Sequence, residues 1–270
     1  MLKDVSFGQF YPTGSIIHKV DARLKLVILI AYIVFIFLSS NFYSLALCSL
    51  FLIVIIALTK IPIRIYVKNF KVILPIIVLT SLLNAIYYHE GTELLNLRLF
   101  SIYSGGLYRA LFMSLRIIIL ILISSVLSYT ATPTELTDSI ESLMTPLKYI
   151  GLGTAVHTIA MMMTIALRFI PTLIEETDKI MASQKARGAD IDTGGLVKRV
   201  KALVPVIIPL LISSVRRAFE LADAMESRCY NGGKGRVRMK RMKLHLKDYV
   251  SLIICICVFA SVILINIFLS

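Results

Sequence analysis

Apolar residues in this chain gather into five long runs that contain few charges. A helix needs about 20 mainly apolar residues to cross a bilayer, and a helix satisfies its own backbone polar groups inside lipid. The pattern therefore predicts an all-α, polytopic membrane protein with about five transmembrane helices, at residues 24–38, 42–58, 72–88, 107–130 and 250–269.

The segment between the fourth and fifth runs, residues 132–247, has a helical pattern of another kind. Thr132-Pro133-Thr134-Glu135 is a typical helix start, with a threonine cap, a proline at the first helical position and a glutamate three residues after the cap. The pattern predicts a module of three long helices, over residues 132–149, 154–186 and 196–228, with bends at Pro171, Pro205 and Pro209.

The apolar parts of the second and third of these helices, residues 159–170 and 204–215, are 12 residues long each. Because this is short of a full span, we expect both helices to lie against, or dip into, the cytoplasmic leaflet and to cross each other. The alternative is that residues 154–172 and 200–216 form two more spans, which would leave the topology of the other helices unchanged.

The charges between the runs indicate how the chain is oriented and divided. The loop after the second run carries Lys60, Arg64, Lys68 and Lys71 and no acid, so we expect it to face the cytoplasm. The amino terminus and residues 132–247 then also face the cytoplasm. We expect three parts: a membrane domain (1–131), a cytoplasmic module (132–247) and a final transmembrane helix (248–270).

Composition agrees with a membrane location, because 57% of the residues are hydrophobic and the mean hydropathy is +0.83. The net charge of +13 is typical of proteins that meet nucleic acid, anionic lipid or an acidic protein partner, and the membrane spans disfavour nucleic acid. The first 20 residues show no cationic start followed by an apolar core, so we expect no cleavable signal peptide.

The residue pattern favours a non-enzymatic role, with no catalytic residue, metal site or bound cofactor. The four cysteines form no CxxC motif, the four histidines are scattered, and there is no Walker sequence for binding ATP. The predicted spans also carry few ionisable residues, whereas a transporter that recognises its own substrate usually places such residues inside the membrane.

Two tripeptides, Ala186-Arg187-Gly188 and Ser227-Arg228-Cys229, end the two longest predicted helices. A terminal arginine can simply complement the negative end of the helix dipole. Here the small neighbours also allow another surface to come close, and a guanidinium can bind carboxylates in two-point fashion. We interpret the tripeptides as two docking tips for a paired partner with acidic grooves.

Arg116 and a basic linker also have candidate roles. Arg116 lies inside the fourth run, where it either bonds a helix carbonyl, reaches the outer headgroups or contacts a partner membrane subunit. A basic linker after the third helix is expected to bind anionic lipid at about 1 kcal/mol per cation; its cations are Lys234, Arg236, Arg238, Lys240, Arg241 and Lys243.

Over essentially its full length, the chain resembles the transmembrane, or T, component of energy-coupling factor transporters. These form a branch of the ABC transporters that imports vitamins and transition-metal ions. The resemblance rests on several motifs together: His18-Lys19-Val20-Asp21-Ala22-Arg23-Leu24-Lys25, Thr132-Pro133-Thr134-Glu135-Leu136, Pro146-Leu147-Lys148 with Gly151, Arg168-Phe169-Ile170-Pro171, Gln184-Lys185-Ala186-Arg187-Gly188 and Ala222-Asp223-Ala224-Met225-Glu226-Ser227-Arg228.

The resemblance implies that the two tips are coupling motifs, each docking into one of two ABC ATPase subunits that bind ATP and magnesium. It also implies a separate substrate-binding S component that selects the vitamin or ion, and a location in a prokaryotic cell membrane. The second tip departs from the family's Ala-Arg-Gly pattern at Ser227 and Cys229, so we expect its backbone to be less free. The alternatives are an ABC permease that carries its own substrate and, less favoured, a polytopic membrane enzyme.

Overall fold

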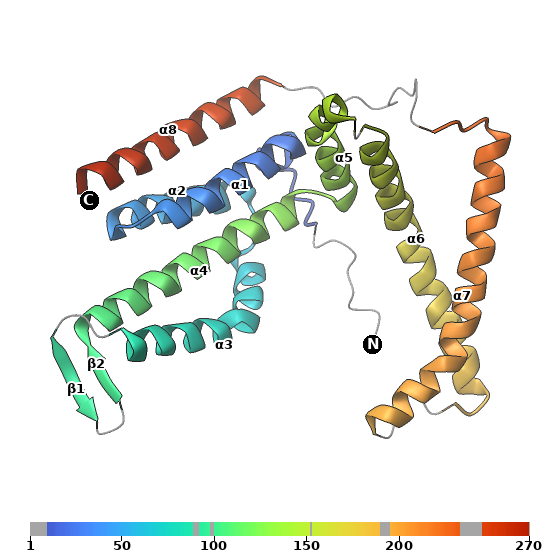
Figure 1. The fold of residues 1–270 in the computed structure, drawn as a ribbon, viewed down its shortest axis with the longest axis horizontal. Coiled ribbons are helices and arrows are strands. Elements are labelled where there is room, and N and C mark those ends of the chain that lie inside the picture. The colour runs from blue at the N-terminus through green and yellow to red at the C-terminus, as the bar shows by residue number, and fades with distance from the viewer. Residues whose placement is uncertain are drawn as a thin grey trace. The chain divides into compact units, whose positions relative to one another are not determined.

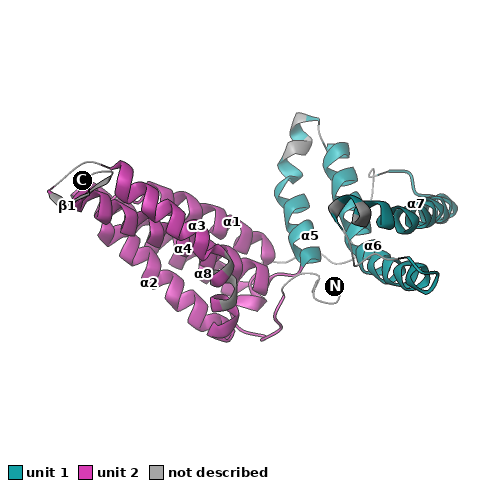
Figure 2. Cartoon of the chain, turned by 90° about the horizontal axis from the view of Figure 1, so that it is seen from below, with its two compact units in different colours: residues 1–7, 133–240 teal, residues 8–132, 241–270 magenta. Residues whose placement is uncertain are grey.

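The computed structural model of the chain describes residues 10–88, 92–97, 100–151, 153–189, 195–232 and 245–269. Its helices form two compact units (Figures 1 and 2), which we call the bundle unit (residues 8–132 and 241–270) and the arm unit (residues 1–7 and 133–240). The predicted all-α class is confirmed. One element was not predicted: an antiparallel hairpin of strands β1 (Glu93–Leu97) and β2 (Phe100–Tyr103).

The bundle unit is built around helices from both ends of the chain. Its elements are η1 (Ile17–Lys19), α1 (Ala22–Leu38), α2 (Phe42–Thr59), α3 (Ile63–Tyr87), α4 (Ser104–Thr130) and α8 (Leu246–Leu269). The Tyr32 hydroxyl of α1 donates to the Cys48 carbonyl oxygen of α2 at 2.6 Å. The Phe35 ring of α1 stacks on the Phe259 ring of α8 with centroids 4.2 Å apart. The last helix therefore shares one core with the first two and with α4.

Helix α3 begins at Ile63, nine residues before the predicted start of this span. Pro62 stands just before the helix in an extended conformation, and the fixed φ of proline suits such a start. Arg64 therefore lies in the first helical turn, where a loop was predicted. Later in the chain, α3 and α4 approach closely at Gly106, where an added Cβ would come within 2.9 Å of the carbonyl oxygens of Ala85 and Tyr88.

Buried polar contacts close the end of the bundle where α1 and α8 begin. The Asp248 side chain is 1% exposed, and its two oxygens accept hydrogen bonds from the backbone N–H groups of Asp21, at 2.9 Å, and His245, at 2.7 Å. Asp21 in turn caps α1 by accepting a hydrogen bond from the Arg23 N–H at 2.9 Å. One carboxylate thus joins the starts of two helices that are far apart in the sequence.

The arm unit contains α5 (Pro133–Leu143), η2 (Thr145–Ile150), α6 (Gly153–Ala186) and α7 (Leu196–Ser227). The predicted start of the first helix and the two long helices are confirmed. The first helix is shorter than predicted, because the α-helical pattern stops at Leu143 and a 3₁₀ segment follows. Pro146 explains this stop, since proline cannot donate the backbone hydrogen bond that would continue the helix. Figure 1 shows α7 changing direction, as expected from its internal Pro205 and Pro209.

Five helices among the described residues are long and apolar enough to cross a membrane: α2, α4, α6, α7 and α8. The number agrees with the prediction, but the set differs. Helix α1 has 17 residues, and the segment Ile73–Tyr87 of α3 is a shorter apolar helix among the described residues. Helices α6 and α7 qualify because each is continuous over more than 30 residues, so residues flanking the short apolar runs extend them.

Candidate functional site at two arginine-bearing helix tips

The first tip is a helix end closed by a Schellman motif. The Gly188 N–H donates to the Lys185 carbonyl oxygen at 3.0 Å, and the Ala189 N–H donates to the Gln184 carbonyl oxygen at 3.0 Å. Gly188 has a φ of +88°, the left-handed conformation on which this motif depends. Arg187 is therefore the last residue before the chain turns away from the axis of α6.

The second tip has the same hydrogen-bond pattern. The Cys229 N–H donates to the Glu226 carbonyl oxygen at 2.8 Å, and the Tyr230 N–H donates to the Met225 carbonyl oxygen at 3.0 Å. Cys229 takes the place of Gly188 with a φ of +57°. Arg187 and Arg228 therefore occupy equivalent positions in equivalent motifs, although their neighbouring residues differ.

Both arginines are exposed, as are the small residues beside them. Neither guanidinium forms an ion pair with another residue in the described part of the chain. Because each tip ends a helix, its last carbonyl groups give this region a partial negative charge that favours a cation. The arrangement thus places two exposed cations at the ends of two long helices.

A polar cluster joins the two long helices between their apolar parts and their tips. Glu176 of α6 and Arg217 of α7 form an ion pair with an Oε2–Nη2 distance of 2.6 Å. The Ser213 hydroxyl of α7 donates to the other oxygen of Glu176. The predicted contact between the two helices is thus present and has a charged centre, which we call the crossing cluster.

The crossing cluster lies at the same sequence distance from both tips. Arg187 follows Glu176 by eleven residues, and Arg228 follows Arg217 by eleven residues. At 1.5 Å per residue, each tip extends about 16 Å beyond the ion pair. The two arginines therefore end arms of equal length.

The first part of α7 exposes a long apolar face, which includes Val204, Ile208 and Leu211 at 45%, 53% and 62% exposure. A patch of this kind is typical of a surface that meets lipid or another protein. On α6, Ile159 and Met162 are also exposed. The arm unit thus combines apolar helix surfaces with polar, arginine-bearing ends.

Arg116 bonds within the bundle unit. Its Nη2 donates to the carbonyl oxygen of Ser39, which caps the end of α1, at 2.5 Å. Its guanidinium also lies over the Phe112 ring, 4.8 Å from the centroid. Of the roles considered for this residue, the structure shows the bond to a helix carbonyl. Contact with a partner subunit stays a prediction.

The six cations of the predicted basic linker, at residues 234–243, lie outside the described residues. Among the described residues, no three histidine, cysteine, aspartate or glutamate side chains come together as a metal site would need.

Sequence reasoning missed Ser213 and Arg217 and gave Glu176 no role in joining the helices. A signal was present, because Ser213 and Arg217 are four residues apart and lie on one face of α7. Without knowledge of which faces of α6 and α7 meet, however, several acids on α6 were equivalent candidates for the contact.

Comparison with known proteins identifies the family. Residues 13–239 match the family model described as CbiQ, cobalt transport protein. The chain is 44% identical to the energy-coupling factor transporter transmembrane protein EcfT of Clostridium kluyveri, covering 97% of this chain and 98% of the relative. It is 42% identical to the protein of that name from Bacillus subtilis, covering 97% of each. The chain therefore belongs to this family of transport proteins and is a transmembrane component of an energy-coupling factor transporter.

Proposed function

We propose that this chain is the scaffold and energy-transducing subunit of an importer driven by two ABC ATPase subunits, on which ATP and magnesium are bound. The observation that carries the proposal is the pair of matched tips, in which Arg187 and Arg228 hold equivalent positions in the same capping motif. Two equivalent cationic tips suit two similar partner subunits, each with an acidic groove for one arginine.

The crossing cluster supports a mechanism in which movement of the tips reaches the membrane. When ATP closes the two ATPases, their grooves carry Arg187 and Arg228 with them. Because Glu176 and Arg217 join the arms, the helices move like scissor blades. The opposite parts of α6 and α7 then shift against a separate substrate-binding subunit, which is tipped or released to deliver a vitamin or a transition-metal ion.

The exposed apolar face of α7 is the surface on which we place this substrate-binding subunit. Apolar contact surfaces suit a partner that is itself embedded in lipid. Substrate choice then belongs to the partner, which agrees with the scarcity of ionisable residues in the predicted spans of this chain.

The test is affinity purification of the chain from native membranes followed by mass spectrometry of the co-purified proteins. We compare the natural chain with an Arg187→Glu/Arg228→Glu variant and with a Lys179→Glu/Arg216→Glu variant. The second variant makes the same charge change at exposed positions of the same two helices, away from the tips.

We expect two ATPases and at least one small membrane protein with the natural chain and with the control variant, and loss of the ATPases with the tip variant. Retention of both ATPases by the tip variant would contradict the docking role of the arginines. A purified complex that transports substrate without another membrane subunit would instead support the permease alternative.

A further inference from the structure

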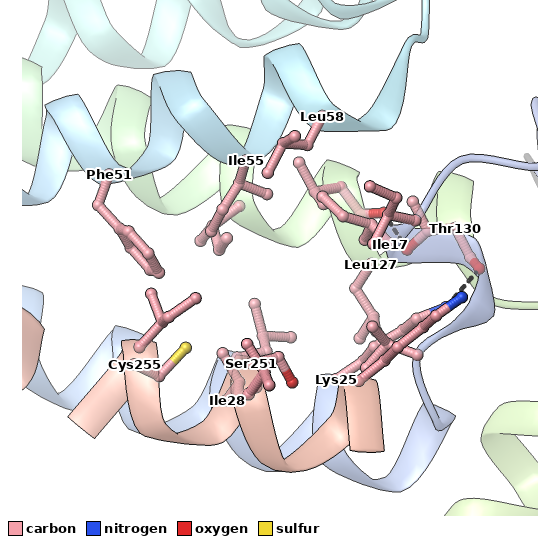
Figure 3. Close-up of a pocket in the computed structure, with 18 of the residues that line it drawn as sticks. Ile17, Lys25, Ile28, Phe51, Ile55, Leu58, Leu127, Thr130, Ser251 and Cys255 are labelled. Atoms are coloured by element: carbon pink, nitrogen blue, oxygen red, sulfur yellow. Dashed lines mark hydrogen bonds between the residues drawn. The ribbon is translucent and has the colours of Figure 1, made fainter. Parts of the chain in front are cut away.

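An apolar cavity of about 400 Å³ lies inside the bundle unit, between α1, α2, α4 and α8 (Figure 3). Phe51 and Ile55 of α2, Ile28 of α1, Leu127 of α4 and Cys255 of α8 contribute to its wall. For comparison, an apolar cavity of about 150 Å³ is enough to bind benzene. This cavity therefore has room for a longer hydrocarbon.

Three polar side chains in the wall, those of Lys25, Thr130 and Ser251, already have partners within the chain. The Thr130 hydroxyl donates to the Val126 carbonyl oxygen, and the Ser251 hydroxyl donates to the Asp248 carbonyl oxygen, both at 2.8 Å. The Lys25 ammonium donates to the carbonyl oxygens of Thr130, at 2.9 Å, and His18, at 3.2 Å. A buried water needs two to four polar partners, so this wall suits a hydrocarbon better than water.

Three exposed lysines either line the cavity or stand within two positions of a lining residue. Lys247, at the start of α8, is part of the wall and is exposed. Lys19 lies in the segment between Ile17 and Val20, which both line the cavity, and Lys60 follows the lining residue Leu58 by two positions; both lysines are exposed.

The acid closest in sequence to Lys247 is Asp248, which is buried and accepts hydrogen bonds from backbone N–H groups. In the described part of the chain it forms no ion pair with Lys247. By the positive-inside rule, we expect the lysine-rich end to face the cytoplasm. The cytoplasmic leaflet is also the one that is rich in anionic lipid.

We propose that the cavity binds one acyl chain of an anionic phospholipid of the cytoplasmic leaflet, with the headgroup phosphate at Lys247. The acyl chain would fill the space between α2 and α8 beside the core that those helices share with α1 and α4. The site is separate from the two tips, so it does not depend on the function proposed for them.

The absence of tryptophan from the whole chain gives a direct test. The full-length Phe51→Trp variant places the single fluorophore in the cavity wall. The Ile53→Trp variant places it on the same helix, where the natural side chain is 64% exposed and is not part of the wall. Each variant is reconstituted in phosphatidylcholine vesicles with a fixed fraction of phosphatidylglycerol. The form of one lipid or the other with brominated acyl chains then replaces an increasing share of its unbrominated form.

We expect brominated phosphatidylglycerol to quench the Phe51→Trp fluorescence at about fivefold lower mole fraction than brominated phosphatidylcholine, as one near-surface cation would give. The Ile53→Trp fluorescence should be quenched equally by both lipids. Adding Lys247→Glu should abolish the preference at position 51. Should Phe51→Trp fail to fold, Leu58→Trp reports from the lysine-rich end. Equal quenching by both lipids, or no quenching, of the tryptophan in the cavity wall would overturn the proposal.

Discussion

Cys229 holds a backbone conformation that a side chain ordinarily disfavours. Its φ of +57° lies in the left-handed region, where a residue with a Cβ costs about 1–2 kcal/mol. The Schellman hydrogen bonds of the second tip hold it there, as they hold Gly188 in the first tip. Cys229 therefore carries a conformational cost that Gly188 does not, which is the physical basis for expecting a less free backbone at the second tip.

The Cys229→Gly change should make the second tip more stable by about 1 kcal/mol, because glycine adopts positive φ without this cost. The measurement is amide hydrogen exchange of the last turn of α7, which should become slower.

Gly188→Ala supplies the matched control and should have the opposite effect on the first tip. An added Cβ meets nothing within 4 Å there, so the cost is conformational alone. Unchanged exchange at both tips would show that the left-handed geometry does not limit their stability.

At the scale of whole helices, Asp248 joins the starts of α1 and α8. Asp248→Ala should lower the free energy of unfolding by about 2–3 kcal/mol, because two hydrogen bonds to a charged group are lost and two partly buried N–H groups lose their partner. Thermal unfolding of the purified chain in detergent measures the effect. Asp223→Ala, at an exposed position of α7, should leave the midpoint nearly unchanged, and an equal loss in both variants would contradict the joining role.

We expect the crossing cluster to stabilise the contact between α6 and α7. Glu176→Ala and Arg217→Ala should each weaken the helix contact, and the double variant should cost about 1 kcal/mol less than the sum, since the pair is partly exposed and screened by solvent. A double-mutant cycle of thermal unfolding measures this coupling. Strict additivity of the two changes would mean that the ion pair does not hold the arms together.

Helix starts and ends were predictable where a local signal exists, as at Pro133 and at both arginine tips. The early start of α3 was not predicted, because the positively charged residues that follow Pro62 indicated a loop. The crossing cluster could not be predicted, because sequence periodicity identifies the faces of one helix but not which face of another helix it meets.

On the scale of the whole molecule, the bundle unit has a lysine-rich end and an end with the β1–β2 hairpin. One carries Lys19, Lys60 and Lys247, and the α3–α4 connection with its hairpin lies at the other end of α3. The contacts of single residues at these ends were beyond prediction. Arg116, for example, could be assigned to a helix carbonyl only as one of several options until the position of Ser39 was known.

Cysteine labelling tests the orientation that these ends predict. In a chain with Cys229 and Cys257 replaced by alanine, Thr92→Cys should react with a membrane-impermeant maleimide added to intact cells. Ile63→Cys, whose natural side chain is 71% exposed, should react only after the cells are made permeable. The reverse pattern would place the lysine-rich end outside.

The equal arms also restrict how this protein can vary. Eleven residues make three helical turns to within about 20°, so each arginine follows the crossing cluster on nearly the same face of its helix. Inserting or deleting one residue in either arm would rotate the tip by about 100° while changing its reach by only about 1.5 Å. The number of residues between Glu176 and Arg187, and between Arg217 and Arg228, therefore matters mainly because it sets the direction of each tip around its helix axis. Substitutions should be tolerated in these two segments far better than insertions or deletions.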